Sequence, residues 1–190
     1  MDEQPDEHAP DQTNGRPAVP DAEEHLRRGR AYARRREHEQ AVAHFTRAIE
    51  LARDSAEAHA QRGNARVAAG DLEGAIADYT EAIRLKPDSA EVYHNRGVAY
   101  GQRGEFERAV ADFTEAIRLE PGAALAYQSR GSARADLGRV AEAIADFSEA
   151  IRLDPRSAEP YMRRGLARAG AGELAPAVAD FTEAVRLRPR

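Results

Sequence analysis

The chain has 190 residues, a formal net charge of −5 and no cysteine, which excludes disulfides, thiolate catalysis and cysteine-ligated zinc. Its length suits one domain of ordinary size or a short stack of repeats. No apolar run is long enough to span a bilayer, and the acidic N-terminus lacks the hydrophobic core of a signal peptide. We therefore expect a cytoplasmic protein that makes no contact with membranes.

Residues 1–21 form an acidic, proline-rich segment. Six acidic residues and a single arginine give it a net charge of −5, and it contains four prolines and no apolar periodicity. Such a segment cannot bury enough apolar surface to offset the entropy of ordering, which predicts a disordered tail. Residues 22–190 are then neutral overall, which argues against general binding to nucleic acids or membranes.

Arginine is strongly preferred over lysine in this chain. Lys86 is the only lysine among 28 basic residues, and alanine is abundant. This bias indicates a GC-rich, bacterial coding genome more than a special role for arginine.

From Ala22 onward the sequence repeats itself every 34 residues. An Arg-Gly step recurs in register at Gly29, Gly63, Gly97, Gly131 and Gly165. An aromatic residue recurs in the same way at Phe45, Tyr79, Phe113, Phe147 and Phe181. Self-similarity at a period of this size is typical of stacked repeats, and the frame is 22–55, 56–89, 90–123, 124–157 and 158–190.

Each repeat is predicted to form two helices. In the third repeat, aromatic and small residues recur at three- and four-residue spacings over 90–103, which predicts a helix that Gly104 ends in the left-handed conformation. The apolar residues of 106–119 predict a second helix, and Pro121 prevents its continuation. The first repeat has Arg53 in the place of this proline, which predicts a looser turn.

The small residues are explained by close packing of the two helices. A hairpin that turns near the fifteenth residue of the repeat brings Gly97 near Ala109 and Phe113, and Tyr93 near Ala116. Glycine then lets the two backbones approach while the phenylalanine fills the gap. A single helix pair cannot bury its apolar face alone, so neighbouring repeats must stack.

This pattern resembles the tetratricopeptide repeat family, and the resemblance covers residues 22–190. The residues that match its motif in the third repeat are Tyr93, Gly97, Tyr100, Ala109, Phe113, Ala116 and Pro121. The resemblance implies an all-α, right-handed superhelical solenoid of antiparallel helix pairs. It also implies that the first helices line a concave groove that binds peptides or partner proteins.

The chain departs from the family at the seventh position of each repeat, which is often leucine in the family and is arginine here. By the hairpin geometry this position faces the twenty-third, which is aspartate in four repeats. We therefore predict the pairs Arg62–Asp78, Arg96–Asp112, Arg130–Asp146 and Arg164–Asp180. A ladder that fixes the register of the helices is favoured over a ligand site. The first repeat, in which Arg28 faces His44, should lack the pair.

Arginine also replaces the family's aromatic residue at the eleventh position of three repeats. These residues are Arg66, Arg134 and Arg168.

Six histidines raise the hypothesis of a metal site. His25 and His59 occupy the aromatic fourth position of their repeats, which favours a packing role, and no His-Glu-x-x-His motif occurs. Carboxylates such as Asp112 and Glu115 recur along the second helices, which is typical of solvated pairs. No phosphate loop or nucleophile elbow is present. We expect no metal, no cofactor and no enzymatic activity.

Function is expected in the groove, where the resemblance places particular positions of each first helix. The candidate partner-binding residues are Arg27, Arg30, Arg34, Gln61, Asn64, His94, Asn95, Val98, Gln102, Gln128, Ser129, Ser132, Met162, Arg163 and Leu166. Amides and hydroxyls in the middle of this set suit the backbone of an extended peptide. The alternative is a polar concave face that is merely solvated.

The last repeat has no successor to cover its second helix, around Val178, Phe181, Val185 and Leu187. Uncapped ends of repeat arrays tend to self-associate, which predicts a homodimer through repeat five. The sequence thus favours a scaffold that binds a protein or an extended peptide. The alternatives are a self-assembly module and, less favoured, a nucleic-acid binder.

Overall fold

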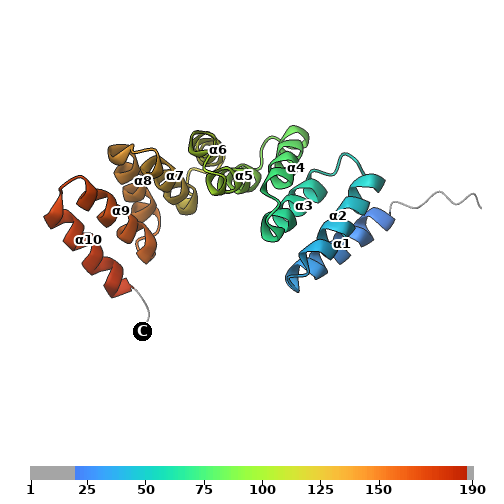
Figure 1. Ribbon diagram of the computed structural model, residues 1–190, viewed down its shortest axis with the longest axis horizontal. Helices are drawn as coiled ribbons and strands as arrows, with labels where there is room; N and C mark the ends of the chain where they lie inside the picture. The colour runs from blue at the N-terminus through green and yellow to red at the C-terminus, as the bar shows by residue number, and fades with distance from the viewer. Residues whose placement is uncertain (1–19, 188–190) are drawn as a thin grey trace, which may run out of the picture.

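The structure, a computed structural model, describes residues 20–187, which form ten α-helices in five antiparallel pairs (Figure 1). The helices are α1 (Pro20–Arg34), α2 (His38–Leu51), α3 (Ala56–Ala69), α4 (Leu72–Leu85), α5 (Ala90–Gln102), α6 (Phe106–Leu119), α7 (Ala124–Asp136), α8 (Val140–Leu153), α9 (Ala158–Gly170) and α10 (Leu174–Leu187). The predicted all-α array of helix pairs is confirmed.

Helix α1 begins two residues before the predicted start of the repeats at Ala22. Pro20 is tolerated there because the first N–H groups of a helix have no intrahelical partner, and Asp21 adds a favourable charge to the first turn. The rest of the predicted disordered tail, residues 1–19, lies outside the described residues.

The helix pairs follow one another along an arch, and the two ends of the array lie far apart (Figure 1). Each odd-numbered helix contacts the next odd-numbered helix, whereas no even-numbered helix contacts another within residues 20–187. The odd-numbered helices therefore line the concave side, as the resemblance implied, and the even-numbered helices splay apart on the convex side.

The turns inside the repeats use the left-handed backbone conformation. Gly104 ends α5 with φ 76°, and the equivalent glycines of repeats two, four and five have φ between 72° and 85°. The first repeat has Arg36 at this place with φ 63°, a conformation that costs a non-glycine residue about 1 kcal/mol. The repeat unit therefore imposes this turn even on an unfavourable residue.

The turns between the repeats do not depend on proline. Ala52, after α2, has φ −138° and ψ 82°, and Glu120, before Pro121, has φ −134° and ψ 82°. In both, the backbone N–H bonds to the carbonyl four residues earlier. The looser turn predicted at Arg53 is therefore wrong, because this hydrogen bond and the stacking of the repeats fix the chain without proline.

Close packing within each repeat rests on the glycine of the Arg-Gly step. A Cβ atom built on Gly97 would lie 2.8 Å from Cε1 of Phe113, closer than side chains can approach. The other four glycines of this set face the aromatic ring of their own repeat at 2.6–2.9 Å. Tyr93 packs against the cluster that contains Ala116, so the predicted contacts of Gly97 with Phe113 and of Tyr93 with Ala116 are confirmed.

The predicted ladder of arginine–aspartate pairs is confirmed in repeats two to five. In the third repeat, Arg96 Nε and Nη2 donate to the two carboxylate oxygens of Asp112, each at 2.8 Å. The equivalent pairs are Arg62–Asp78, Arg130–Asp146 and Arg164–Asp180. All four aspartates are buried, so each carboxylate requires a cationic partner.

The same arginines also join neighbouring repeats. The remaining guanidinium nitrogen, Nη1, donates to a hydroxyl on the second helix of the preceding repeat. These hydrogen bonds are Arg62–Thr46, Arg96–Thr80, Arg130–Thr114 and Arg164–Ser148, at 2.9–3.2 Å. One side chain thus connects three helices, which fixes the register between repeats as well as within them.

The arginines of the eleventh position add a second cation to three of these aspartates. Arg66, Arg134 and Arg168 donate to Asp78, Asp146 and Asp180 at 2.7–2.8 Å. The spacing contains the signal for this arrangement, since the seventh and eleventh positions lie one turn apart on the same helix face. The third repeat has Tyr100 there, so Asp112 has one arginine.

The first repeat replaces the ladder by a pair of histidines. His25 Nδ1 lies 3.0 Å from His44 Nδ1, and the ring of Tyr32 stacks on His44 with the centroids 5.1 Å apart. Burial, then the nearby His25 and Arg28, lower the pKa of His44. Arg28 bonds to Glu24 on its own helix, so the predicted absence of an arginine–aspartate pair in this repeat is confirmed.

Candidate partner-binding groove

Polar side chains link successive first helices along the concave face. The links are Arg30–Glu57, Asn64–Asn95 and His94–Ser129. Asn64 Oδ1 accepts from the Asn95 amide at 3.2 Å and from the Tyr79 hydroxyl at 2.7 Å. The amide N–H groups of Asn64 have no partner among residues 20–187, so they are available to a carbonyl oxygen of a bound chain.

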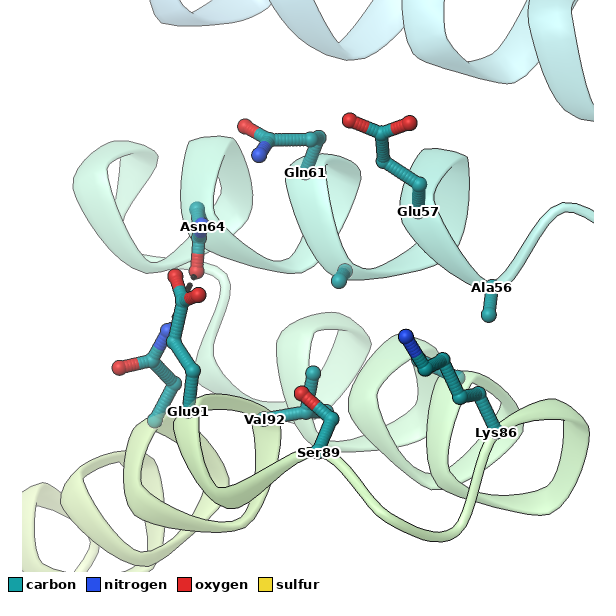
Figure 2. Close-up of a pocket in the computed structure, with 11 residues that line it drawn as sticks. Ala56, Glu57, Gln61, Asn64, Lys86, Ser89, Glu91 and Val92 are labelled. Carbon is teal, nitrogen blue, oxygen red and sulfur yellow. Dashed lines mark hydrogen bonds between the residues drawn. The ribbon is translucent and has the colours of Figure 1, made fainter.

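A polar cavity of about 300 Å³ lies between α3 and α5. Figure 2 shows Lys86, in the loop after α4, directed toward α3, whose residues Glu57 and Gln61 also line the cavity. Glu91 of α5 also lines it. The sequence analysis does not include Lys86, because the periodicity of helix faces does not place a loop side chain. It also leaves out Glu57 and Glu91, although both lie in the first turns of their helices.

An apolar trough follows in repeats three to five. A cavity of about 410 Å³ lies between α5 and α7, and a second of about 320 Å³ lies between α7 and α9. Both are lined by Ser132, Asp136 and Arg163, so they adjoin. Their apolar lining comes from Val98, Phe106, Phe113, Val140, Phe147 and Leu166. The side of the groove near α9 is therefore suited to apolar side chains.

Two glycines of the trough have no packing reason to be glycine. A Cβ atom on Gly101 of α5 or Gly170 of α9 would meet nothing within 4 Å, and neither residue has a positive φ. Glycine in a helix interior costs about 1 kcal/mol relative to alanine. At Gly101 the absence of a side chain leaves open space in the cavity between α5 and α7.

The predicted groove residues divide into two sets. Those that line the cavities described above, or a smaller one near Leu125, are Gln61, Asn64, His94, Asn95, Val98, Gln102, Gln128, Ser129, Ser132, Arg163 and Leu166. Those that line none of these cavities are Arg27, Arg30, Arg34 and Met162. Arg27 bonds instead to Glu24 on its own helix, and Arg30 bonds to Glu57, which itself lines the cavity between α3 and α5.

The groove contains one histidine with a shifted pKa, His94. Burial lowers the pKa of His94, whose ring lies 5.3 Å from that of Phe113 and whose Nε2 lies 3.1 Å from Ser129 Oγ. His94 is therefore neutral at pH 7 and bonds to the hydroxyl as a neutral ring.

Two searches of residues 20–187 concern other kinds of site. No group of three or more His, Asp or Glu side chains is arranged to hold a metal ion in this part of the chain. None of its helices has the length and apolarity needed to cross a bilayer.

These features define an α-solenoid whose repeated residues hold the helices together and whose varied residues line a groove. Sequence profiles described as Tetratricopeptide repeat match residues 22–55, 94–158 and 129–190, and one described as TPR repeat matches 63–104. The chain belongs to the tetratricopeptide repeat family. A search of curated protein sequences finds no significant match.

Solved structures share the fold at low sequence identity. MamA from Desulfovibrio magneticus has 19% identity and a TM-score of 0.84, over 88% of this chain and 94% of that one. PilF of Pseudomonas aeruginosa has 20% identity and a TM-score of 0.79, over 90% and 78%. YrrB, described as a TPR protein with an unusual peptide-binding site, has 21% identity and a TM-score of 0.77, over 89% and 87%. At these identities the likeness concerns the fold alone.

Proposed function

We propose that the protein is a non-enzymatic scaffold that binds an extended peptide, or an extended segment of a partner protein, along its concave groove. The observation that carries this proposal is the trough of repeats three to five. Leu166 is 58% exposed and Val98, Phe106 and Val140 are partly exposed, whereas Phe113 and Phe147 are buried in the rigid scaffold beneath them. Exposed apolar side chains in a concave surface are typical of binding sites.

The polar part of the groove supports an extended conformation of the bound chain. The amides of Asn64, Asn95 and Gln128 lie on successive first helices, each beside one of the cavities. Side-chain amides can both donate to and accept from a peptide backbone, which gives affinity with little demand on the partner's sequence. Selectivity would then come from apolar side chains that enter the trough. The peptide-binding site named for YrrB supports this use of the fold.

The test is selection from a random peptide library against the full-length protein, followed by affinity measurements on groove variants. Gln128→Ala should weaken binding about 3- to 10-fold, the value of one hydrogen bond. Val98→Glu, which places a charge in the trough, should abolish binding.

Arg118→Ala is the matched control, because Arg118 lies on the second helix of its repeat, is exposed and pairs only with Glu115. Far-UV circular dichroism should show that all three variants keep the fold. Equal affinity of all variants for every selected peptide would refute the proposal.

Self-association through repeat five is the second candidate function. Val178 and Val185 are 63% and 67% exposed, while Phe181 and Leu187 are partly covered. Burial of this face against the same face of another copy would form a closed dimer. Sedimentation of the full-length protein tests this, since the dimer should dissociate in Phe181→Glu. A strict monomer at high concentration would exclude it.

A further inference from the structure

The four junctions between repeats are built alike. In each, the first helix of one repeat packs on the second helix of the repeat before it. The third residue of the incoming repeat is buried and small or apolar: Ala58, Val92, Ala126 and Pro160. At the junction of repeats two and three, Val92 and Ala99 of α5 share one cluster with Ala75, Tyr79 and Ala82 of α4.

Among residues 20–187, no helix packs on the face of α10 that is equivalent to the receiving half of the other junctions. Helix α10 contacts only α9 among the described helices. Leu174, Val178 and Val185 are 63–67% exposed, whereas their equivalents in repeats one to four are buried or half-buried. At the other junctions, the equivalent hydroxyl accepts a hydrogen bond from an arginine. The hydroxyl of Thr182 instead donates to the carbonyl oxygen of Val178 on its own helix.

The first repeat presents the inserting half of a junction, with one change. Helix α1 has Ala31 and Arg28 at the tenth and seventh positions, like the other first helices. Its third residue, however, is Glu24, where the others have an apolar residue. Glu24 bonds to both Arg27 and Arg28. Arg28, which no preceding repeat covers within residues 20–187, is 58% exposed, against 13–16% for the ladder arginines.

We propose that the open face of repeat five is a docking site for the first helix of another repeat array, one with a small apolar third residue and an arginine four residues later. The face continues an interface that the chain already forms four times. Glu24 prevents the chain's own α1 from being that helix, because docking would bury its carboxylate among alanine and valine side chains. Docking would also require Glu24 to break its hydrogen bond with Arg28.

The charge at Glu24 has a consequence for assembly. If α1 fitted the face of repeat five, each copy would add to the next by a head-to-tail contact that does not close, and open filaments would form. Glu24 therefore keeps the face free for a different chain. This inference is independent of the proposed groove function, since it involves only the two ends of the array.

The test uses the full-length protein and changes one charge. Glu24→Ala gives α1 the third residue found at Ala58 and Ala126, so it should self-associate through an open-ended series of species. We expect an association constant at least about tenfold above that of the wild type, since the buried charge is removed. Glu23→Ala is the matched control, because Glu23 is exposed on the same helix. Sedimentation velocity over a range of concentrations measures the species.

A second variant defines which surfaces meet. Val178 is largely exposed, so Val178→Glu should keep the fold. It should abolish the series of associated species formed by Glu24→Ala. The double variant, which has a docking helix and no receiving face, should bind one wild-type molecule and stop. The inference is overturned if Glu24→Ala sediments like the wild type, or if its association persists with Val178→Glu.

Discussion

Removal of the Asp112 carboxylate tests whether the arginine–aspartate ladder holds the repeats in register. Asp112 and Arg96 are 7% and 16% exposed in their side chains, so the pair lies largely out of water. The hydrogen bonds that Arg96 donates to Asp112 raise the pKa of Arg96. The guanidinium stays charged in the variant even without them, because arginine is not deprotonated in proteins. Asp112→Ala would leave that charge with the Thr80 hydroxyl as its only hydrogen-bond partner among residues 20–187, beside the rings of Tyr93 and Tyr100.

The expected cost follows from the burial of the charge that remains. Removal of one partner from a buried ion pair typically costs 3–5 kcal/mol, and the partial exposure of Arg96 places this case at about 3 kcal/mol. For a protein of this size, that loss should lower the melting temperature by about 6–12 °C. Replacement of both partners, in Arg96→Leu with Asp112→Ala, removes the unpaired charge and should cost about 1 kcal/mol or less.

The assay is urea unfolding followed by far-UV circular dichroism at pH 7, on the wild type, both single variants and the double variant. The double variant should be about 2 kcal/mol more stable than Asp112→Ala, so the losses of the two single variants should not add. Arg118→Ala serves as the control for loss of an exposed ion pair and should cost less than about 1 kcal/mol. If the single losses simply add in the double variant, the ladder does not act as a buried pair and the reasoning is refuted.

Three further predictions concern the helix faces. Gly97→Ala should destabilise the fold by about 1–3 kcal/mol in urea unfolding, since its Cβ would meet Phe113; unchanged stability would contradict the close packing. Gly101→Ala should instead stabilise the fold by about 0.5–1 kcal/mol and weaken binding of selected peptides, which isothermal titration would detect; equal affinity would show that the trough floor is not used. Because burial lowers the pKa of His94 below its ordinary 6.5, the unfolded chain takes up a proton first, and stability should fall as the pH drops through 6.5, with a smaller fall in His94→Gln.

The sequence alone predicts the scaffold because the scaffold is what repeats. The Arg-Gly step occurs once in each of the five repeats, so its packing role in one repeat can be checked against the others. Hairpin geometry alone predicts that Arg96 lies beside Asp112. It did not place Arg66 beside Asp78, although the two arginines of that repeat share a helix face, because the eleventh position was compared only with the aromatic residue of the family.

The groove is less predictable for the opposite reason, since its residues differ from repeat to repeat. Periodicity identifies the face of α5 that carries Asn95, but not whether that face is open. The position of Lys86 depends on a loop, and the direction of Arg30 depends on its pairing with Glu57. The role of Gly101 depends on empty space in front of a helix, which no sequence pattern reports.

Hydrogen–deuterium exchange of the full-length protein, with and without a peptide selected for binding, tests the central claim most directly. The claim is that the varied residues of the first helices bind the partner while the repeated residues only build the scaffold. Bound peptide should slow exchange most in α5, α7 and α9, with smaller changes where Phe106 of α6 and Val140 of α8 line the trough, and leave α4 unchanged. Protection confined to the second helices, or to α10, would contradict it.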